Sequence, residues 1–352
     1  MLLLSLFSLL NTVLGAQVSP SFLDSAVQPQ RKPGIQSTFQ WNSTRALIGP
    51  KNDDRKIAGI KDPSVVYVDG RYHLFASTAK SGGSSYNLVY ITFTDFEQAP
   101  TADFFYLDQS AIGVGYRAAP QVFYFEPHGL WYLVFQNDNA AYSTNKNISD
   151  PSGWSAVTNF YDKRPAVIDK NIADGYWVDM WVICDDENCH LFSSDDMGQL
   201  YRSQTKLTDF PRGFDSNNTV IAKSDKRFDL FEASNVYRIE NGSYLLIVEC
   251  IDAEEHRWFR SWTAESLEGP WDELAATNEN PFARRNNVAF SGPTWTKDIS
   301  HGEIIRDKVD QTLTITPCKL QYMYQGRDPN VTTNYNNLPW KLALLTQTNS
   351  EC

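Results

Sequence analysis

The sequence predicts an all-β protein, a five-bladed β-propeller built as one domain. Strand–turn–strand units recur along the chain with a period of roughly 50 to 70 residues, the size of one four-stranded propeller blade. Helical signatures are almost absent, and no Pro/Ser-rich linker divides the chain. A β-sandwich with similar hairpins is the alternative, but sandwiches seldom run to about 310 residues without a second domain.

Each unit reads as a strand, a tight turn and a second strand. Asp69-Gly70 and Asn241-Gly242 supply hairpin turns in the first and fourth units. In chain order the units are "DPSVVYVDGRYHLFAS", "APQVFYFEPHGLWYLVFQ", "VDMWVICDDENCHLFSS", "EASNVYRIENGSYLLIVEC" and "ISHGEIIRDKVDQTLTITPCKLQYMYQG". Their heads fall near residues 62, 119, 179, 232 and 301. Five such units predict five blades.

The chain begins with an apolar run that ends in small residues, which is typical of a secretory signal peptide over residues 1–16. A membrane anchor, the alternative, needs roughly 20 apolar residues. We expect residues 17–40 to form a leader or closing segment and residues 41–352 to form the propeller. A monomer is the default for a secreted protein of this size.

Secretion agrees with five N-glycosylation sequons and with the cysteine pattern. The sequons begin at Asn42, Asn147, Asn217, Asn241 and Asn330. In "CDDENC", a hairpin would bring Cys184 and Cys189 face to face, whereas Cys250 reads as a buried thiol and Cys318 could pair with Cys352. The net charge of -11 argues against a nucleic-acid or anionic-membrane partner.

Acidic residues stand at the heads of three predicted blades: Asp62, Asp179 and Glu232. If the first strand of each hairpin is the innermost of its blade, these carboxylates converge on one end of the central channel. Such a group suits glycoside hydrolysis, which needs one protonated and one ionised carboxyl group. We expect Glu232, between apolar Phe231 and Ala233, to be the acid and Asp62, beside Lys61, the base, with Asp179 as modulator.

The sequence resembles glycoside hydrolase family 62, the α-L-arabinofuranosidases that remove arabinose from arabinoxylan. The stretches that carry the resemblance include "IKDPSVVYVDGRYHLFASTA", "YWVDMWVICDD", "LFSSDDMGQLYRS", "FEASNVY", "SGPTWTKDISHGEIIR" and "YNNLPWKLALLT". The resemblance implies a five-bladed propeller that works with inversion, with Asp62 as base, Asp179 as the residue that tunes pKa values and Glu232 as acid.

The resemblance also implies binding residues and an ion. Lys61 and Arg327 are expected to line the arabinose pocket, and Tyr335 and Asn336 to contact the xylan chain of an arabinoxylan or arabinoxylo-oligosaccharide substrate. A structural calcium ion in the channel, bound by His301 and waters, is expected, although calcium prefers oxygen ligands. No cofactor is expected for the chemistry.

Two positions depart from the pattern that the resemblance implies. Asn137 follows Gln136 where many family members have tryptophan, so one stacking platform for xylose is missing. Met180 stands where an aromatic residue is common, which bears on the shape of the pocket. The alternative functions are a family 43-like arabinanase or β-xylosidase, and a secreted sugar-binding propeller without catalysis.

Overall fold

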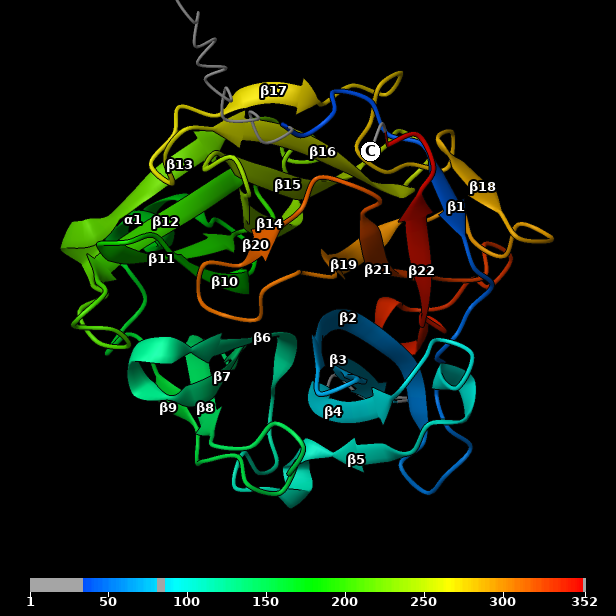
Figure 1. Ribbon diagram of the computed structural model, residues 1–352, viewed down its shortest axis with the longest axis horizontal. Coiled ribbons are helices and arrows are strands. Elements are labelled where there is room, and N and C mark those ends of the chain that lie inside the picture. Colours follow the sequence, from blue (N-terminus) through cyan, green and yellow to red (C-terminus); the bar gives the residue numbers. More distant parts are fainter. Residues whose placement is uncertain (1–33, 81–85, 351–352) are drawn as a thin grey trace, which may run out of the picture. The chain divides into compact units, whose positions relative to one another are not determined.

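The computed structural model describes residues 34–80 and 86–350, which form five sheets around a central axis (Figure 1). The described residues belong to one compact unit, so the predicted five-bladed propeller and its single domain are confirmed. The predicted signal peptide, residues 1–16, lies outside the described residues, as does most of the segment 17–40. No helix in the described part of the chain is long and apolar enough to cross a membrane.

The first three sheets follow chain order from the centre outward. Blade one contains β2 (Ile57–Val68), β3 (Arg71–Lys80), β4 (Tyr86–Phe93) and β5 (Phe104–Tyr106). Blade two contains β6 (Ala118–Phe125), β7 (Leu130–Gln136), β8 (Ala140–Asn145) and β9 (Thr158–Asn159). Blade three contains β10 (Val178–Cys184), β11 (Asn188–Ser194), β12 (Gln199–Lys206) and β13 (Thr219–Ser224).

The last two sheets each have five strands, and each combines strands from distant parts of the chain. Blade four contains β14 (Glu232–Ile239), β15 (Tyr244–Ile251), β16 (Arg257–Ala264), β17 (Asp272–Ala275) and β20 (Thr314–Ile315). Blade five contains β1 (Trp41–Ser43), β18 (Val288–Phe290), β19 (Ser300–Ile304), β21 (Gln321–Gly326) and β22 (Lys341–Gln347). The fifth predicted unit is therefore not one simple hairpin, because β20 leaves it to pair with β14.

Helical structure is confined to short connections in the described residues, as the sequence predicts. The single α-helix there is α1 (Ala166–Asn171). The 3₁₀ turns are η1 (Ala99–Thr101), η2 (Leu107–Gln109), η3 (Glu126–His128), η4 (Ser216–Asn218) and η5 (Tyr335–Asn337).

The predicted hairpin turns form because their residues accept a left-handed backbone. Asp69 and Gly70, with φ of 50° and 76°, join β2 to β3. Val68, the last residue of β2, pairs directly with Arg71, the first residue of β3. Gly242, with φ of 99°, lies in the turn between β14 and β15. Both turns are as the sequence predicts.

Aromatic side chains fill the space between neighbouring sheets. Trp181 of β10 packs against Tyr237 of β14, with ring centroids 5.4 Å apart, and donates from its indole nitrogen to the Val236 carbonyl. Phe259 of β16 meets Tyr322 of β21 at 5.5 Å. The aromatic residues counted in the sequence therefore serve first as the core that holds the blades together.

The cysteine predictions are confirmed in the described part of the chain. Cys184 and Cys189 form a disulfide between paired residues of β10 and β11. Cys250 is a buried free cysteine. Cys318 is disulfide-bonded, and Cys352, its expected partner, lies outside the described residues.

Each innermost strand contains a β-bulge where its register with the second strand shifts. The shifts fall between Lys61/Ser64, Ala118/Gln121, Val178/Trp181, Glu232/Asn235 and Ser300/Gly302. Asp62 and Asp179 lie within these bulges with positive φ, 51° and 59°. Asp62 is thus not at the head of its strand, as predicted, but inside β2, because the bulge lets the strand continue past Pro63.

Candidate active site

The bulges of three blades bring Asp62, Asp179 and His301 into contact. His301 Nδ1 lies 3.4 Å from Asp62 Oδ1 and 3.7 Å from Asp179 Oδ1. All three residues are at most 9% exposed. The structure therefore gathers, at one end of the channel, residues that lie more than a hundred positions apart in the sequence.

The bulge in β2 also turns Lys61 and Asp62 toward each other. Neighbouring residues of a regular strand point to opposite faces. Here the positive φ of Asp62 breaks that alternation, and Lys61 Nζ lies 3.9 Å from Asp62 Oδ1. Lys61 can therefore act on the carboxylate beside it, which strand geometry by itself would not allow.

Asp62 is held in its ionised form. Burial raises the pKa of this carboxyl group, but the positive charge of Lys61, His301 and a hydrogen bond from Ser77 outweigh burial, so the pKa falls below its usual value. The Asp62 amide donates to Gln325 Oε1 at 2.6 Å and fixes the bulge. An ionised, positioned carboxylate of this kind can accept a proton from water.

Asp179 has the opposite electrostatic character. Burial, followed by the neighbouring charges of Glu232 and Asp62, raises the pKa of the Asp179 carboxyl group well above its usual value. Its Oδ2 accepts a hydrogen bond of 2.6 Å from the Ala233 amide, next to Glu232 in the sequence. Asp179 therefore links the first and fourth blades of the site electrostatically.

Glu232 is paired with an arginine, which corrects the expectation of an apolar setting. Arg257 NH1 donates to Glu232 Oε1 at 2.5 Å and also contacts Glu249. Phe231 and Ala233 are buried, but their neighbour's carboxyl group reaches past them to Arg257, which β16 carries. The surroundings of the Glu232 carboxyl group therefore include a cation from another strand, which its neighbours in the sequence do not reveal.

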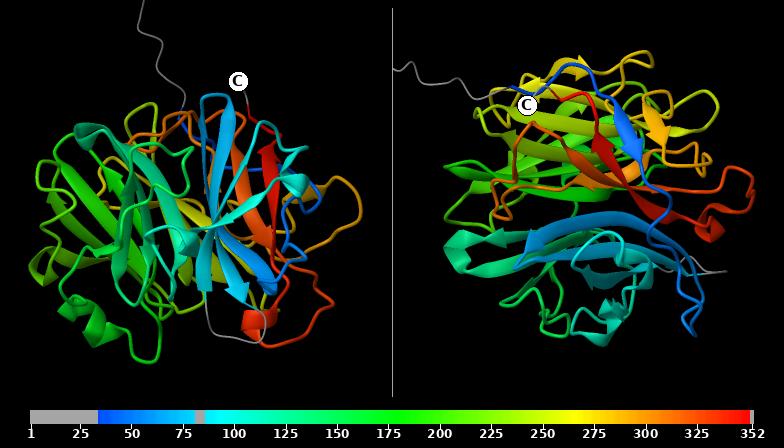
Figure 2. Two further views of the ribbon diagram at one scale, coloured as in Figure 1. Left: turned by 90° about the horizontal axis from the view of Figure 1, so that it is seen from below. Right: turned by 45° about the vertical axis from the view of Figure 1, so that its right-hand side comes forward.

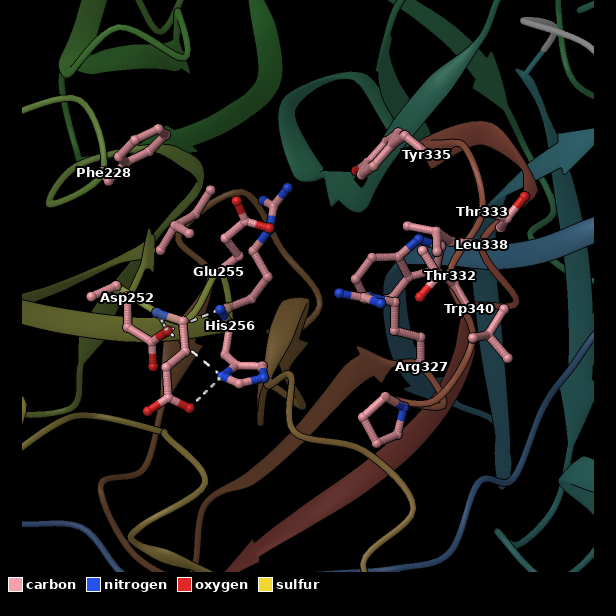
Figure 3. Close-up of a pocket in the computed structure, with 16 residues that line it drawn as sticks. Phe228, Asp252, Glu255, His256, Arg327, Thr332, Thr333, Tyr335, Leu338 and Trp340 are labelled. Atoms are coloured by element: carbon pink, nitrogen blue, oxygen red, sulfur yellow. Dashed lines mark hydrogen bonds and ion pairs between the residues drawn. The ribbon is translucent and has the colours of Figure 1, made fainter.

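An open cleft of about 730 Å³ adjoins these carboxyl groups (Figure 3). One wall carries the β15–β16 turn, with Asp252, Glu255 and His256, and the opposite wall carries residues 327–340. Arg257 lines the cleft and pairs with Glu232. Tyr335 also lines the cleft and accepts a hydrogen bond from Lys61. The cleft therefore leads to the carboxyl groups.

The expected binding residues surround Lys61. Lys61 Nζ donates to the Tyr335 hydroxyl at 2.9 Å and lies 4.7 Å from the centre of its ring. Asn336 Oδ1 accepts a hydrogen bond of 2.8 Å from Tyr86. Arg327 lies farther along the cleft, where it pairs with Asp298 at 3.1 Å and stacks over Trp340. Tyr335 is 44% exposed, so its ring is open to a ligand.

The two departures from the family pattern occupy different surroundings. Met180 is buried in the core next to Asp179, which fits a role in packing. Asn137 is half-buried, and its side-chain nitrogen donates to Asn159 Oδ1 at 3.1 Å. No aromatic ring is present at position 137 to stack on a sugar.

The expected calcium ion is not supported by the residues around His301. In the described ranges, 34–80 and 86–350, no group of three or more histidine, cysteine, aspartate or glutamate side chains could hold a metal ion. The Nδ1 atom of His301 instead faces two carboxyl groups at ion-pair distance. His301 therefore lies between Asp62 and Asp179, within 4 Å of both carboxyl groups.

Sequence reasoning missed the residues that support the cluster from the second and third strands. Glu249 is fully buried, and its carboxyl group accepts from Ser300, from the His301 amide and from Arg257. One signal was available, since a glutamate inside the apolar run "YLLIVEC" is costly to bury unless it is paired. Arg257 had no comparable signal, because an arginine at the start of a strand is usually solvated.

Comparison with known proteins places this site in a family. The model for Glycosyl hydrolase family 62 matches residues 40–346. A curated relative, α-L-arabinofuranosidase C of Cellvibrio japonicus (strain Ueda107), is 41% identical over 320 residues, which cover 90% of this chain and 48% of the relative. The chain thus spans about half the length of that relative.

Three solved structures are similar to this chain, and two of them carry the same family name. The catalytic domain of a family 62 α-L-arabinofuranosidase from Coprinopsis cinerea is 62% identical, with a TM-score of 0.88, over 90% of this chain and 100% of that one. The α-L-arabinofuranosidase PaAbf62A from Podospora anserina, in complex with cellotriose, is 58% identical (TM-score 0.88; 90% and 99% covered). A family 62 hydrolase in complex with xylotriose is 56% identical (TM-score 0.86; 89% and 98% covered).

The chain is a five-bladed propeller with buried carboxyl groups beside an open cleft, and the family model matches nearly all of the propeller. Together these features define a glycoside hydrolase. Within that class, the chain belongs to glycosyl hydrolase family 62, the family of these α-L-arabinofuranosidases.

Proposed function

We propose that this protein removes α-L-arabinofuranosyl side chains from the xylose backbone of arabinoxylan, with inversion at the anomeric carbon. The observation that supports it best is the placement of carboxyl groups of opposite electrostatic character in one buried site. Asp62 has a lowered pKa and Asp179 a raised one, and Glu232, whose charge helps to raise the pKa of Asp179, pairs with Arg257, a residue that lines the cleft. The inverting course rests on the resemblance of the lysine–aspartate–proline motif to that of the family.

Asp62 is the general base in this proposal. Hydrolysis with inversion requires an ionised carboxylate that removes a proton from water as the water attacks the anomeric carbon. Lys61 and His301 keep the Asp62 carboxyl group ionised, and its side chain is only 8% exposed. A carboxylate so enclosed reacts with a water held in the pocket rather than with bulk solvent.

Glu232 is the general acid. The acid must reach the glycosidic oxygen, and that oxygen belongs to a xylose unit that stays in the open cleft. The Glu232 side chain is 19% exposed, against 8% for Asp62 and 10% for Asp179. Among the three carboxyl groups, Glu232 is therefore the one best placed to contact the xylan chain. Asp179 tunes the pKa values of the other two.

The shape of the cleft fits a polysaccharide chain. Tyr335 and Trp340 line one wall, and aromatic rings are suited to stacking on sugars. A similar family 62 structure was solved with xylotriose and another with cellotriose. Both ligands are linear chains of β-linked sugars, which agrees with a backbone that lies along the cleft while the arabinose enters the carboxyl cluster.

The reaction is tested by measuring arabinose release from arabinoxylan and from debranched arabinan. We expect faster release from arabinoxylan, and proton NMR should show the inverted β-anomer first. Glu232→Gln should reduce kcat by roughly 10²- to 10⁴-fold, the usual contribution of a positioned acid. Glu240→Gln, at the opposite end of the β14 region, is the matched control and should keep wild-type activity.

Faster release from debranched arabinan would instead favour a family 43-like arabinanase. Unchanged function in Glu232→Gln would instead indicate a propeller that binds sugar without catalysis. A first product with the α-configuration would contradict inversion. Asp62 would then act as a nucleophile and not as a general base.

We also propose that the protein is a secreted, N-glycosylated monomer. The sequence begins with a signal-like apolar run, and all five sequon asparagines, at positions 42, 147, 217, 241 and 330, have exposed side chains. In one sequon the Ser243 hydroxyl already donates to Asn241 Oδ1 at 2.7 Å. Expression in a eukaryotic host should yield protein in the medium whose mass falls after enzymatic glycan removal, and retention inside the cell would contradict the proposal.

A further inference from the structure

A second carboxyl group, Asp196, lies against the proposed acid and has no part in the mechanism above. It belongs to the turn between β11 and β12, in the third blade, and is 9% exposed. Its carboxyl group is within hydrogen-bonding contact of the Glu232 carboxyl group. Two carboxyl groups in direct contact inside a protein are costly unless a proton lies between them.

The turn that carries Asp196 is built to hold it in place. Asp195 Oδ1 accepts from the amides of Met197 and Gln199, and Asp195 Oδ2 accepts from the Tyr201 hydroxyl. Asp196 itself has a positive φ of 59°, and its carbonyl accepts from Arg227 Nε at 2.9 Å. The side chain of Asp196 is therefore directed at Glu232 by a turn with several independent supports.

The hydrogen bonds around Asp196 indicate that it carries a proton. Its Oδ1 atom is buried and accepts from no donor in the described parts of the chain. An ionised Asp196 would leave that oxygen unsatisfied, which costs free energy. A protonated Asp196 can instead donate to Glu232, which removes the repulsion between the two carboxylates.

The charges that face Asp196 act in the same direction. Burial, then the negative charges of Glu232 and Asp179, raise the pKa of Asp196 to about 9, and the positive charge of Arg257 opposes them only in part. Arg227 contacts the backbone of Asp196 and not its carboxyl group. At neutral pH the Asp196 side chain is therefore mainly protonated.

Arg257 and Asp196 both contact the Glu232 carboxyl group. Arg257 donates a hydrogen bond to Glu232 Oε1, but a guanidinium group does not give up a proton in proteins, whereas a protonated carboxyl group can. We propose that Asp196 is a positioning residue that stores the proton which Glu232 delivers to the glycosidic oxygen. This inference rests on the proposed role of Glu232 as general acid.

The proton balance closes over one turnover. As the bond between the anomeric carbon and the glycosidic oxygen breaks, Glu232 gives a proton to that oxygen and receives one from Asp196. Asp62 takes a proton from the water that attacks the anomeric carbon. Asp62 then releases its proton to solvent and Asp196 regains one, so that one water is consumed for each arabinose released.

The test is Asp196→Asn, which keeps a hydrogen-bond donor beside Glu232 but holds no transferable proton. The kcat/KM on arabinoxylan should fall by about 10²-fold, the lower end for acid–base groups. Activity on 4-nitrophenyl α-L-arabinofuranoside, whose leaving group needs no proton, should stay within about threefold of wild type. The high-pH limb of the arabinoxylan profile should also move to lower pH.

A matched control uses a carboxylate of the same blade that lies away from Glu232. Asp186→Asn removes an exposed carboxylate from the β10–β11 turn, so it should leave both the pH profile and the ratio of the two substrates at wild-type values. If Asp196→Asn lowers activity on both substrates equally, with an unchanged pH profile, Asp196 is merely structural and the inference is wrong.

A second measurement covers the case in which Asp196→Asn does not fold. Carbon-13 NMR of aspartate-labelled wild-type protein should show a carboxyl group that titrates near pH 9; in Asp179→Asn this titration should move to lower pH but stay above the usual aspartate range. Absence of that titration overturns the inference. If the wild-type protein releases no arabinose from either substrate, the proposed function itself fails, which is a distinct result.

Discussion

At the scale of single residues, the candidate site depends on which charges lie next to each other. Lys61, the neighbour of Asp62, contributes most among the groups that lower the pKa of Asp62. Burial lowers the pKa of Lys61 itself, but Asp62 and the tyrosines around it outweigh burial, so Lys61 remains charged. Lys61 and Asp62 therefore form a buried ion pair, in which each residue keeps the other in its charged form.

Replacement of Lys61 by methionine should shift the pH dependence of activity. Methionine keeps the apolar stem but removes the charge, so burial is left to raise the pKa of Asp62. Because the base must be ionised, and a group with a raised pKa ionises only at higher pH, the acid limb of kcat/KM should move to higher pH. The profile is measured on arabinoxylan.

Lys80→Met is the control for that experiment, because Lys80 is exposed at the end of β3. Its profile should match that of the wild type. An acid limb that stays in place in Lys61→Met would mean that Lys61 does not set the charge of Asp62.

The sequence allowed the carboxyl groups to be predicted but not their supporting partners. Asp62, Asp179 and Glu232 stand out because each lies near the head of a repeated unit. Asp196 and Arg257 reach the site from a turn and from a third strand, where the repeat gives no position to compare. Their roles follow from contacts between blades, which no local pattern encodes.

At the scale of the strands, the bulges organise the site. The amide of the bulge in each blade donates to a side chain of the preceding blade, and these hydrogen bonds make a ring around the channel. The five pairs are Asp62 to Gln325, Ala119 to Ser77, Asp179 to Gln136, Ala233 to Asp179 and His301 to Glu249. Asp179 is both donor and acceptor in this ring, so it supports the channel as well as the acid.

The ring predicts that Gln136 is important for stability. Gln136→Met keeps the size of the side chain but leaves the buried Asp179 amide without its acceptor, which should cost about 1–3 kcal/mol in the free energy of unfolding. Urea denaturation measures it. Gln321→Met, at a half-exposed position of β21, is the matched control and should change stability by less than about 0.5 kcal/mol. Equal effects in the two variants would contradict the ring.

Turns and bulges differ in how far they could be predicted. Asp69-Gly70 was predicted because few residue pairs accept the left-handed backbone of a tight hairpin. The bulge positions hold Asp62, Ala119, Asp179, Ala233 and His301, which share no side-chain chemistry. They are imposed by hydrogen bonds from the neighbouring blade, so the pattern within each strand did not predict them.

At the scale of the whole propeller, closure joins the two ends of the described chain. The blade count was predicted from the repeat, but the composition of the last blade was not, because β1 comes from the other end of the chain. β1 pairs with β22 antiparallel and with β18 parallel, and Figure 2 shows β1 in blue beside β22 in red. A strand of three residues gave no periodic signal in the sequence.

Closure predicts different effects for two truncations. A chain that starts at Gly34 keeps β1, and should melt cooperatively. A chain that starts at Ala46 lacks β1 and the Trp41 side chain. That side chain is 1% exposed, meets the Phe282 ring edge to face and donates to the Phe282 carbonyl at 2.7 Å. Loss of a buried tryptophan by itself costs about 3–5 kcal/mol, and the edge of β22 would also lose its partner.

The melting temperatures of the two chains, followed by circular dichroism, are the measurement. The shorter chain should melt much lower, or fail to fold, and Trp41→Ala in the longer chain should lie between them. Because the Asp62 amide donates to Gln325 Oε1 of the same fifth blade, the shorter chain should also lose activity below its melting temperature. If it melts and hydrolyses like the longer one, β1 does not close the propeller.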